Sequence, residues 1–210
     1  DSASRGLGDV YKRQFLSSAP SLSKCPPDEG IEVAFAGRSN AGKSTALNTL
    51  TKNKKLAKTS KTPGRTQLIN FFSLTENQRL VDLPGYGYAK VPLEIKKKWD
   101  INLSNYLRYR QSLKGLILMM DCRHPLTRYD QQMLDWSSQT DINIHILLTK
   151  ADKERNNALN ATLNHVNQFI MKTEKPLKTV TAQLFSSKTK LGLTQLEEQI
   201  NFWFQESSQF

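Results

Sequence analysis

The chain has 210 residues and a formal net charge of +11 at pH 7, which leaves two interpretations open, a solvated basic surface or a polyanionic partner such as RNA. Its length allows one α/β domain and excludes two of ordinary size, and we expect neither a membrane span nor secretion, because no apolar run reaches transmembrane length and no signal-peptide core is visible. The two cysteines, Cys25 and Cys122, have no metal-ligand spacing, which favours a reduced, cytoplasmic protein.

The N-terminal part of the chain has no clear periodicity. We expect residues 1–14 to be a non-native or disordered tail. Residues 15–30 contain Ser, Pro and Asp and are expected to form an irregular lead-in to the first strand. The folded domain is therefore expected to occupy residues 31–206.

The first strong signal is a glycine-rich loop between a strand and a helix. Residues 31–36 are short and apolar, which predicts a buried strand. In residues 44–50, Leu47 and Leu50 are spaced to share a helix face. Between them, residues 37–44 read GRSNAGKS and fit the phosphate-binding pattern G-x-x-x-x-G-K-[ST]. This context favours a phosphate loop over a structural glycine turn.

Each residue type in the phosphate loop (residues 37–44) suits phosphate binding. The glycines allow backbone turns that point N–H groups at phosphate oxygens, and the helix N-terminus adds further donors. Lys43 supplies a positive charge for the outer phosphates, and the Ser44 hydroxyl can ligate Mg²⁺. The predicted contact residues are Gly37, Arg38, Ser39, Asn40, Ala41, Gly42, Lys43, Ser44 and Thr45.

Two segments after the first helix are candidates for contacts to a terminal phosphate. Residues 52–65 carry six Lys or Arg and no acid, and they occupy the position of the segment that closes over the phosphate in nucleotide switches; a plain solvated loop is the alternative. A threonine there can complete the Mg²⁺ shell, and we choose Thr66, with Thr62 as the alternative. The runs 67–75 and 78–81 predict a hairpin that ends in DLPG at residues 82–85. Its aspartate can hold Mg²⁺ through water, and its glycine N–H can approach the γ-phosphate.

The rest of the chain alternates between helices and strands. The pattern predicts helices over residues 93–112, around 133–136, over 157–172 and over 193–204, and strands over 115–121, 142–148 and 179–185. In the first of these helices Ile95, Trp99, Leu103, Tyr106 and Leu107 recur at helical spacing, and its aromatic residues are interpreted as core, with base stacking as the alternative. His145 is expected in or beside the core. The fold class is α/β, with a mostly parallel six-stranded sheet, helices on both faces and ligand-bearing loops at the strand C-terminal ends.

Two later loops suit recognition of a guanine base. The strand over 142–148 leads into TKAD at residues 149–152, where the Asp152 carboxylate can accept hydrogen bonds from N1–H and the exocyclic amino group of guanine. Adenine offers neither donor, so the carboxylate would remain unpaired and adenine would be rejected. The Lys150 stem can lie along the base plane, and the backbone of residues 186–188 can cap the base oxygen.

Taken together, these motifs resemble the bacterial EngB/YihA/YsxC family of translation-factor-type P-loop GTPases, a branch of the TrmE-Era-EngA-EngB-septin-like group. The resemblance extends from about residue 15 to the C-terminus. It rests on GRSNAGKS (37–44), TSKTPGRTQ (59–67), VDLPGYGYA (81–89), TKAD (149–152) and FSS (185–187).

The resemblance implies a single Ras-like G domain over residues 31–206 that binds GTP and GDP with Mg²⁺ and hydrolyses GTP to GDP and phosphate. It also implies a role in assembly of the large ribosomal subunit, and thereby in growth and cell division, with the subunit precursor (rRNA and ribosomal proteins) as partner. We expect a cytoplasmic monomer that does not bind membranes. The alternative is an RNA-binding module whose affinity is set by guanine nucleotide while hydrolysis is incidental. An ATP-using phosphotransferase would leave Asp152 without a role.

The family roles carry over residue by residue. The predicted catalytic residues are Lys43, Thr66 and Gly85, and the predicted Mg²⁺ ligands are Ser44, Thr66 and Asp82. The two switch contacts would be Gly64, Arg65, Thr66, Gln67 and Leu68, and Asp82, Leu83, Pro84 and Gly85. The base would be bound by Thr149, Lys150, Ala151 and Asp152, helped by Phe185, Ser186 and Ser187.

Three residues bear on affinity and rate. Thr149 stands where most GTPases have an asparagine that ties the base loop to the phosphate loop, so we expect modest affinity. Tyr86 stands where Ras-like proteins have the glutamine that orients the attacking water, so we expect slow intrinsic hydrolysis, accelerated by a partner such as the ribosomal particle. Asn40 matches the position found in potassium-dependent GTPases and could bind K⁺ near the developing charge; a loop cap is the equally weighted alternative.

Overall fold

The computed structural model describes residues 14–57, 68–87, 92–140, 142–172 and 180–206. Within these ranges, no helix is both long enough and apolar enough to cross a membrane. Residues 1–13 of the expected tail (1–14) lie outside the described residues, whereas Gln14 begins strand β1, so the expected tail is one residue too long.

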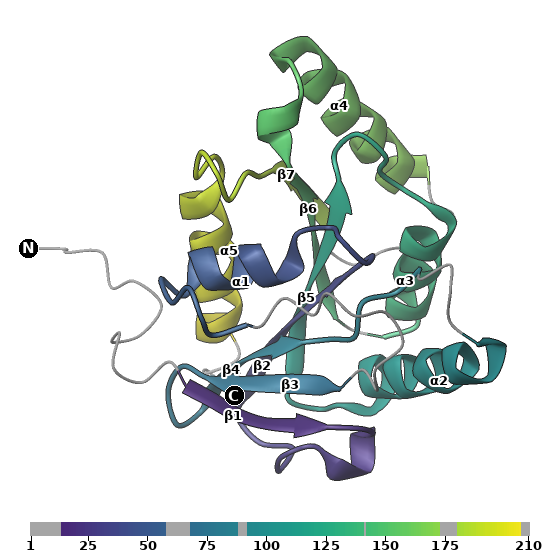
Figure 1. The fold of residues 1–210 in the computed structure, drawn as a ribbon, viewed down its shortest axis with the longest axis vertical. Helices are drawn as coiled ribbons and strands as arrows, with labels where there is room; N and C mark the ends of the chain where they lie inside the picture. Colours follow the sequence, from purple (N-terminus) through teal and green to yellow (C-terminus); the bar gives the residue numbers. More distant parts are fainter. Residues whose placement is uncertain (1–13, 58–67, 88–91, 141, 173–179, 207–210) are drawn as a thin grey trace, which may run out of the picture.

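A seven-stranded sheet forms the centre of the molecule, in the order β1-β3-β4-β2-β5-β6-β7 (Figure 1). Strands β4, β2, β5, β6 and β7 pair in parallel, whereas β3 pairs antiparallel with β4 and β1 pairs antiparallel with β3. The strands are β1 (Gln14–Ala19), β2 (Ile31–Gly37), β3 (Ile69–Ser73), β4 (Gln78–Asp82), β5 (Leu113–Asp121), β6 (Asn143–Thr149) and β7 (Val180–Leu184). The predicted α/β class, hairpin and parallel order are confirmed.

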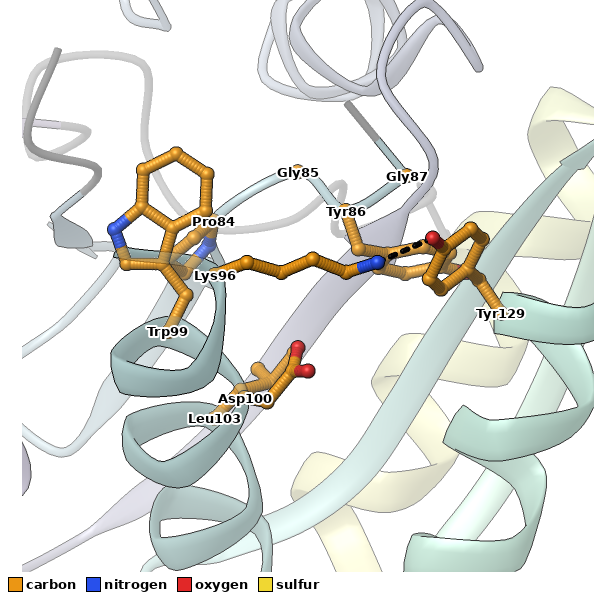
Figure 2. A pocket seen from close by; sticks show the side chains of 9 residues that line it. All are labelled: Pro84, Gly85, Tyr86, Gly87, Lys96, Trp99, Asp100, Leu103 and Tyr129. Atoms are coloured by element: carbon orange, nitrogen blue, oxygen red, sulfur yellow. Dashed lines mark hydrogen bonds between the residues drawn. The ribbon is translucent and has the colours of Figure 1, made fainter. Parts of the chain in front are cut away.

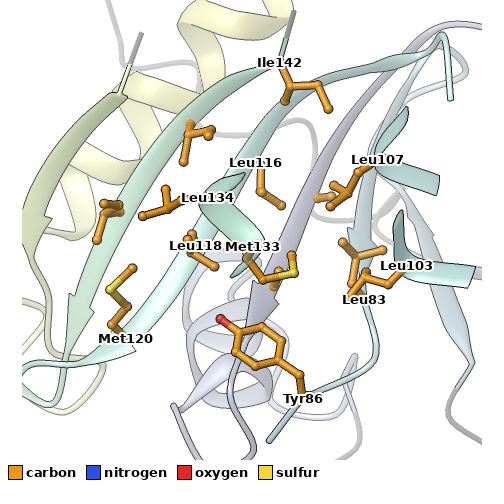
Figure 3. Close-up of a cluster of buried hydrophobic side chains, with 14 of the residues drawn as sticks. Leu83, Tyr86, Leu103, Leu107, Leu116, Leu118, Met120, Met133, Leu134 and Ile142 are labelled. Atoms are coloured by element: carbon orange, nitrogen blue, oxygen red, sulfur yellow. The ribbon is translucent and has the colours of Figure 1, made fainter. Parts of the chain in front are cut away.

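Helices cover both faces of the sheet, as predicted. They are α1 (Lys43–Leu50), α2 (Leu93–Tyr109), α3 (Arg128–Ser138), α4 (Asn156–Lys172) and α5 (Leu193–Glu206), with short 3-10 turns at Leu22–Lys24 and Ala151–Lys153. Side chains of β2 alternate between two cores: Ala34 and Ala36 pack with α2, α3 and α4, while Val33 and Phe35 pack with α1 and α5. Figure 3 shows the first of these cores.

The first strand corrects the sequence analysis, which expected an irregular lead-in and six strands. Residues 14–19 form the edge strand β1, so the sheet has seven strands among the described residues. Polar and apolar residues do not alternate cleanly in this segment, and Phe15 is 56% exposed, so its pattern gives little strand signal. Backbone pairing with β3, interrupted by a register shift between Phe15 and Ser17, holds it in place.

Helix α2 also differs from expectation, at its N-terminal end. Leu103, Tyr106 and Leu107 are buried, as predicted. Trp99 is only half-buried, so the interpretation of this aromatic residue as core is wrong, and Ile95, at the same helical spacing, is 38% exposed. The first two turns of α2 lie beside the loop after β4 rather than on the sheet, which leaves less apolar surface to cover them.

His145 lies in the core, as predicted, and its ring is fully used. Its Nδ1 and Nε2 atoms hydrogen-bond the Thr181 hydroxyl (2.7 Å) and the Gln183 amide oxygen (2.9 Å) of β7. Burial lowers the pKa of His145, so the neutral ring is favoured.

A buried carboxylate anchors the end of the sheet opposite the strand C-terminal ends. Glu32 of β2 is fully buried and accepts hydrogen bonds from Arg79 (3.0 Å), the Tyr106 hydroxyl (2.8 Å) and two nitrogens of Arg110 (2.7 and 3.0 Å). Arg110 also donates to the carbonyl oxygen of Pro26 (2.9 Å). This cluster fixes the C-terminal end of α2, the start of β2 and the lead-in segment to one another.

Candidate nucleotide-binding site

The predicted motifs meet at one edge of the sheet. Strands β2, β4, β6 and β7 are parallel, and each is followed by one of them: the phosphate loop, the segment starting at Asp82, the base motif (residues 149–152) and the Phe185–Ser187 turn. Because parallel strands end on the same side, the topology gathers all four motifs at the carboxyl edge.

The phosphate loop presents a row of unpaired backbone donors. Asn40 and Gly42 adopt left-handed conformations, with φ of 67° and 92°, which turn the loop before α1 begins. Within the described part of the chain, the N–H groups of Asn40, Gly42, Lys43, Ser44 and Thr45 have no hydrogen-bond partner. Such a run at a helix N-terminus is a binding site for anionic oxygens.

The other predicted loop residues shape the loop instead of offering free donors. The Ser39 N–H donates to the Tyr86 carbonyl (2.9 Å), and the Ala41 N–H donates to the Arg38 carbonyl (2.9 Å). Gly37 closes β2, and a Cβ there would come within 3.0 Å of the Met119 carbonyl oxygen.

A charged pair lies at the mouth of the loop. The Lys43 ammonium contacts the carboxylate of Asp82, which is nearly buried at the end of β4. Ser44 follows in the first turn of α1. Among the described residues, no group of three or more His, Cys, Asp or Glu could hold a metal on its own. One hydroxyl and one carboxylate, completed by water and phosphate oxygens, is nevertheless a set that Mg²⁺ accepts.

Most of the first switch contact falls outside the described residues. Gly64, Arg65, Thr66 and Gln67, and the alternative Thr62, lie in the range 58–67. Leu68 is described and is half-buried just before β3.

The base motif is tied directly to the phosphate loop. The Thr149 hydroxyl lies 2.6 Å from the carbonyl oxygen of Ala41 and 3.1 Å from that of Met120. A hydroxyl has one proton to donate, and the shorter distance favours Ala41. Although threonine replaces the usual asparagine at position 149, its hydroxyl joins the base motif to the phosphate loop.

Ser186 orients the carboxylate that is predicted to read the base. Its hydroxyl donates to Asp152 Oδ1 (2.7 Å), and this bond is the main reason why the pKa of Asp152 is lowered. The Ser186 N–H is already bonded to the Leu191 carbonyl (3.1 Å). Among the described residues, the N–H groups of Ser187 and Lys188 have no partner, so both are free donors of this turn.

Three predicted site residues serve as supports. Phe185 lies in the core, and its carbonyl accepts the Ala151 N–H (3.1 Å), so its aromatic ring does not face the base motif. Ala151 is itself buried. Leu83 is buried as well, and its backbone N–H donates to the Phe35 carbonyl (3.0 Å).

Asp121, at the end of β5, is a site residue that the sequence analysis missed. Its carboxylate accepts hydrogen bonds from Arg123 (2.7 and 2.9 Å) and pairs with the ammonium group of Lys150 (3.1 Å). Arg123, then Lys150, holds the pKa of Asp121 well below its usual range. Asp121 and Lys150 border a polar cleft of about 120 Å³ that Asn40 also lines. The position of Asp121 at the carboxyl end of a parallel strand is the sequence signal from which it could have been predicted.

Tyr86 and Asp130 form a second connection that the sequence did not reveal. The Tyr86 hydroxyl donates to Asp130 Oδ1 (2.8 Å), and both side chains are buried, 8% and 2% exposed. Burial raises the pKa of both groups, with Asp130 also raising that of Tyr86. The Tyr86 side chain therefore faces α3.

A small pocket lies between the segment 84–87 and helices α2 and α3 (Figure 2). Lys96 reaches across it from α2, hydrogen-bonds the Tyr129 hydroxyl and lies 4.5 Å from the centre of the Tyr129 ring. With about 20 Å³ of free space, the pocket has room for about one water molecule. It is a packing joint rather than a ligand site.

Comparison with known proteins gives a consistent result. A family model described as "50S ribosome-binding GTPase" matches residues 32–150. The chain is 53% identical over 196 residues to a probable GTP-binding protein EngB of Idiomarina loihiensis, covering 93% of this chain and 94% of that protein. It is 54% identical over 198 residues to one of Escherichia coli, covering 94% and 93%.

Solved structures show the same fold. A crystal structure of a probable GTP-binding protein engB has a TM-score of 0.67 at 22% identity, covering 84% of this chain and all of that one. Era in complex with MgGDPNP and nucleotides 1506–1542 of 16S ribosomal RNA has a TM-score of 0.60 at 17% identity, covering 83% of this chain and 57% of that one.

Proposed function

Because the chain belongs to the EngB proteins of the 50S ribosome-binding GTPase family, we propose that this GTPase uses Mg²⁺-bound GTP to time a step in assembly of the large ribosomal subunit. Its effect on growth and cell division would follow from that step. The GTP-binding domain would occupy residues 31–206, with β1 as an added edge strand.

One contact supports this assignment more than any other, the bond from Thr149 to the Ala41 carbonyl. It joins the base motif to the phosphate loop, so a single nucleotide can span both. In the proposed pose the five free N–H groups of residues 40 and 42–45 bind the phosphates. Asp152 and the Ser187 N–H bind guanine on its amino and carbonyl sides.

Ser44 and Asp82 would hold Mg²⁺, the former directly and the latter through water, with Thr66 as the proposed third ligand. The ion would neutralise charge on the outer phosphates. Lys43 would then turn from the Asp82 carboxylate to the γ-phosphate, and the Gly85 N–H would contact the same group. Residues 64–68 would supply the other switch contact.

We propose slow intrinsic hydrolysis and acceleration by the ribosomal particle. Two observations support this. The Tyr86 side chain is bonded to Asp130 and faces α3, so it is not placed to orient an attacking water. Residues 82–87 read DLPGYG and contain no glutamine that could take over this role. A large-subunit partner is further supported by the family description and by exposed lysines at positions 52, 54, 55, 97 and 98.

Potassium dependence is a separate proposal. The Asn40 side chain is exposed, stands at a left-handed position and makes no hydrogen bond to described residues, which favours a ligand role over a loop cap. Single-turnover hydrolysis in KCl and in NaCl is expected to be faster in KCl. Equal rates would remove potassium from the mechanism.

The test of the main proposal is co-sedimentation with immature large-subunit particles in GDP, in GTP and in a non-hydrolysable GTP analogue. We expect binding that depends on the nucleotide and weakens steeply with salt. A Ser44→Ala variant that has lost hydrolysis but still supports assembly would favour an RNA-binding module instead. Binding that is the same with every nucleotide would contradict the proposal.

The free thiols of Cys25 and Cys122 fit a cytoplasmic location, and we propose a monomer.

A further inference from the structure

The pairing between β2 and β4 continues past the end of β4, after an interruption. The last regular pair is Phe35 with Asp82, and an isolated parallel bridge follows between Arg38 and Tyr86. The two pairs are three residues apart on one chain segment and four on the other, so one extra residue bulges out between them. The bulge is formed by residues 84–85 and contains Gly85.

The bulge is pinned on both sides by backbone hydrogen bonds. Before it, the Leu83 N–H donates to the Phe35 carbonyl (3.0 Å). After it, the Tyr86 N–H donates to the Gly37 carbonyl (3.3 Å), and the Tyr86 carbonyl accepts the Ser39 N–H (2.9 Å). The position of the Gly85 peptide relative to the phosphate loop is therefore set by how firmly Tyr86 is held.

Asp130 holds Tyr86 from the other side. One of its oxygens accepts the Tyr86 hydroxyl at 2.8 Å. The other accepts the N–H (2.8 Å) and the hydroxyl (2.7 Å) of Thr127, at the start of α3. The carboxylate is thus fixed by its own helix, and it is almost fully buried, where each bond is stronger than in water.

The chain then turns away at a position that only glycine fits. Gly87 has φ of 77°, and a Cβ there would lie 2.9 Å from Cγ of Arg38. The stem of Arg38 therefore lies against the chain directly after Tyr86. With Asp130 on one side and Arg38 on the other, Tyr86 is enclosed.

We propose that Asp130 is a positioning residue for recognition of the γ-phosphate, acting through Tyr86 to hold the Gly85 peptide at the phosphate loop. The inference rests on the proposed function, in which the Gly85 N–H contacts that phosphate. GDP has no γ-phosphate, so the contribution of Asp130 is confined to GTP. If Asp130 had a purely structural role, its replacement would weaken the binding of GDP and of GTP to the same extent.

The experiment measures the dissociation constants of GDP and of a non-hydrolysable GTP analogue, at saturating Mg²⁺, for Tyr86→Phe, Asp130→Asn and the double variant. In each single variant the preference for the GTP analogue over GDP is expected to fall about threefold to tenfold, the size of one lost hydrogen bond. In the double variant this preference should fall by no more than it does in the more affected single variant, because both substitutions remove the same contact. Tyr129→Phe, a neighbouring tyrosine bonded to Lys96, is the matched control and should keep the wild-type preference.

Three results separate the possibilities. A preference that is unchanged or increased in Tyr86→Phe overturns the inference, and this variant carries the test if Asp130→Asn does not fold. Gly85→Ala examines the proposed function itself, since an unchanged preference there would mean that Gly85 does not meet the γ-phosphate. If Gly85→Ala lowers the preference while Tyr86→Phe and Asp130→Asn leave it intact, only the role of Asp130 is wrong.

Discussion

Replacing Thr149 by valine removes the hydroxyl that joins the base motif to the phosphate loop and keeps the side-chain shape. Thr149 is 3% exposed, so the vacated carbonyl of Ala41 would stay largely shielded from water. Leaving a buried acceptor unpaired costs about 1–3 kcal/mol of unfolding free energy. We expect the variant to fold with a stability reduced by that amount.

The effect on nucleotide binding follows from the position of Ala41 between two of the free N–H donors. Without its tie, the backbone at this residue has to be ordered again when phosphate binds. Ordering one residue costs about 1–2 kcal/mol, which corresponds to about five- to thirtyfold weaker binding. The binding of GDP and of GTP should weaken to the same extent, because in the proposed pose these donors face phosphates that both nucleotides carry.

The assay is titration of GDP and of a GTP analogue, alongside urea unfolding without nucleotide. The control is Thr181→Val, which removes a threonine hydroxyl bonded to His145, away from the phosphate loop. Wild-type affinity in a destabilised Thr149→Val would show that the tie serves stability only. Weakened binding of the GTP analogue alone would place Ala41 near the γ-phosphate and refute the reasoning.

Three further predictions concern the base, the sheet anchor and the thiols. Asp152→Asn should lose at least about tenfold in GTP affinity and gain affinity for XTP, because the introduced amide can donate to the xanthine oxygen. Competition binding of GTP and XTP measures both effects. An intact preference for guanine would mean that the base binds elsewhere. Glu32→Gln should reduce the unfolding free energy by up to about 3–5 kcal/mol, since it leaves buried Arg110 with the partly exposed Asp28 (3.4 Å) as its remaining charge partner. Urea unfolding measures this loss, and titration should show an unchanged GDP affinity. Burial raises the pKa of Cys25 and Cys122 to about 11, so alkylation should be slow at pH 8 and accelerate as pH approaches 11; fast labelling of the folded protein at pH 8, seen by mass spectrometry, would contradict this.

The parts of the site that the sequence predicted are those encoded by neighbouring residues. The phosphate loop is recognisable because turn glycines, a lysine and a helix start have to follow one another directly in the chain. The same holds for the four residues of the base motif. The parallel strand order then followed from the alternation of strands and helices, which allows few other arrangements.

The contacts that the sequence did not predict join residues far apart in the chain. Asp130 meets Tyr86 only because α3 packs beside the loop after β4, and nothing near either residue marks the pair. In the same way, Thr149 was recognised as a departure from the usual asparagine, but its bond to Ala41 depends on how β2 and β6 flank β5. Local patterns carry no information on such pairings.

Helix α2 is held at its C-terminal end by a buried carboxylate and near its start by the bond from Lys96 to Tyr129 of α3. Tyr106 and Arg110 hydrogen-bond Glu32, whereas Lys96 and Trp99, near the start of the helix, line the pocket that the bulge containing Gly85 also lines. A helix of 17 residues is about 25 Å long. Because the C-terminal end of α2 is fixed at Glu32, a displacement at Gly85 would move the first turns of the helix more than its last turns. In the proposed pose, a change in the γ-phosphate contact at Gly85 would thus reach the protein surface through the first turns of α2.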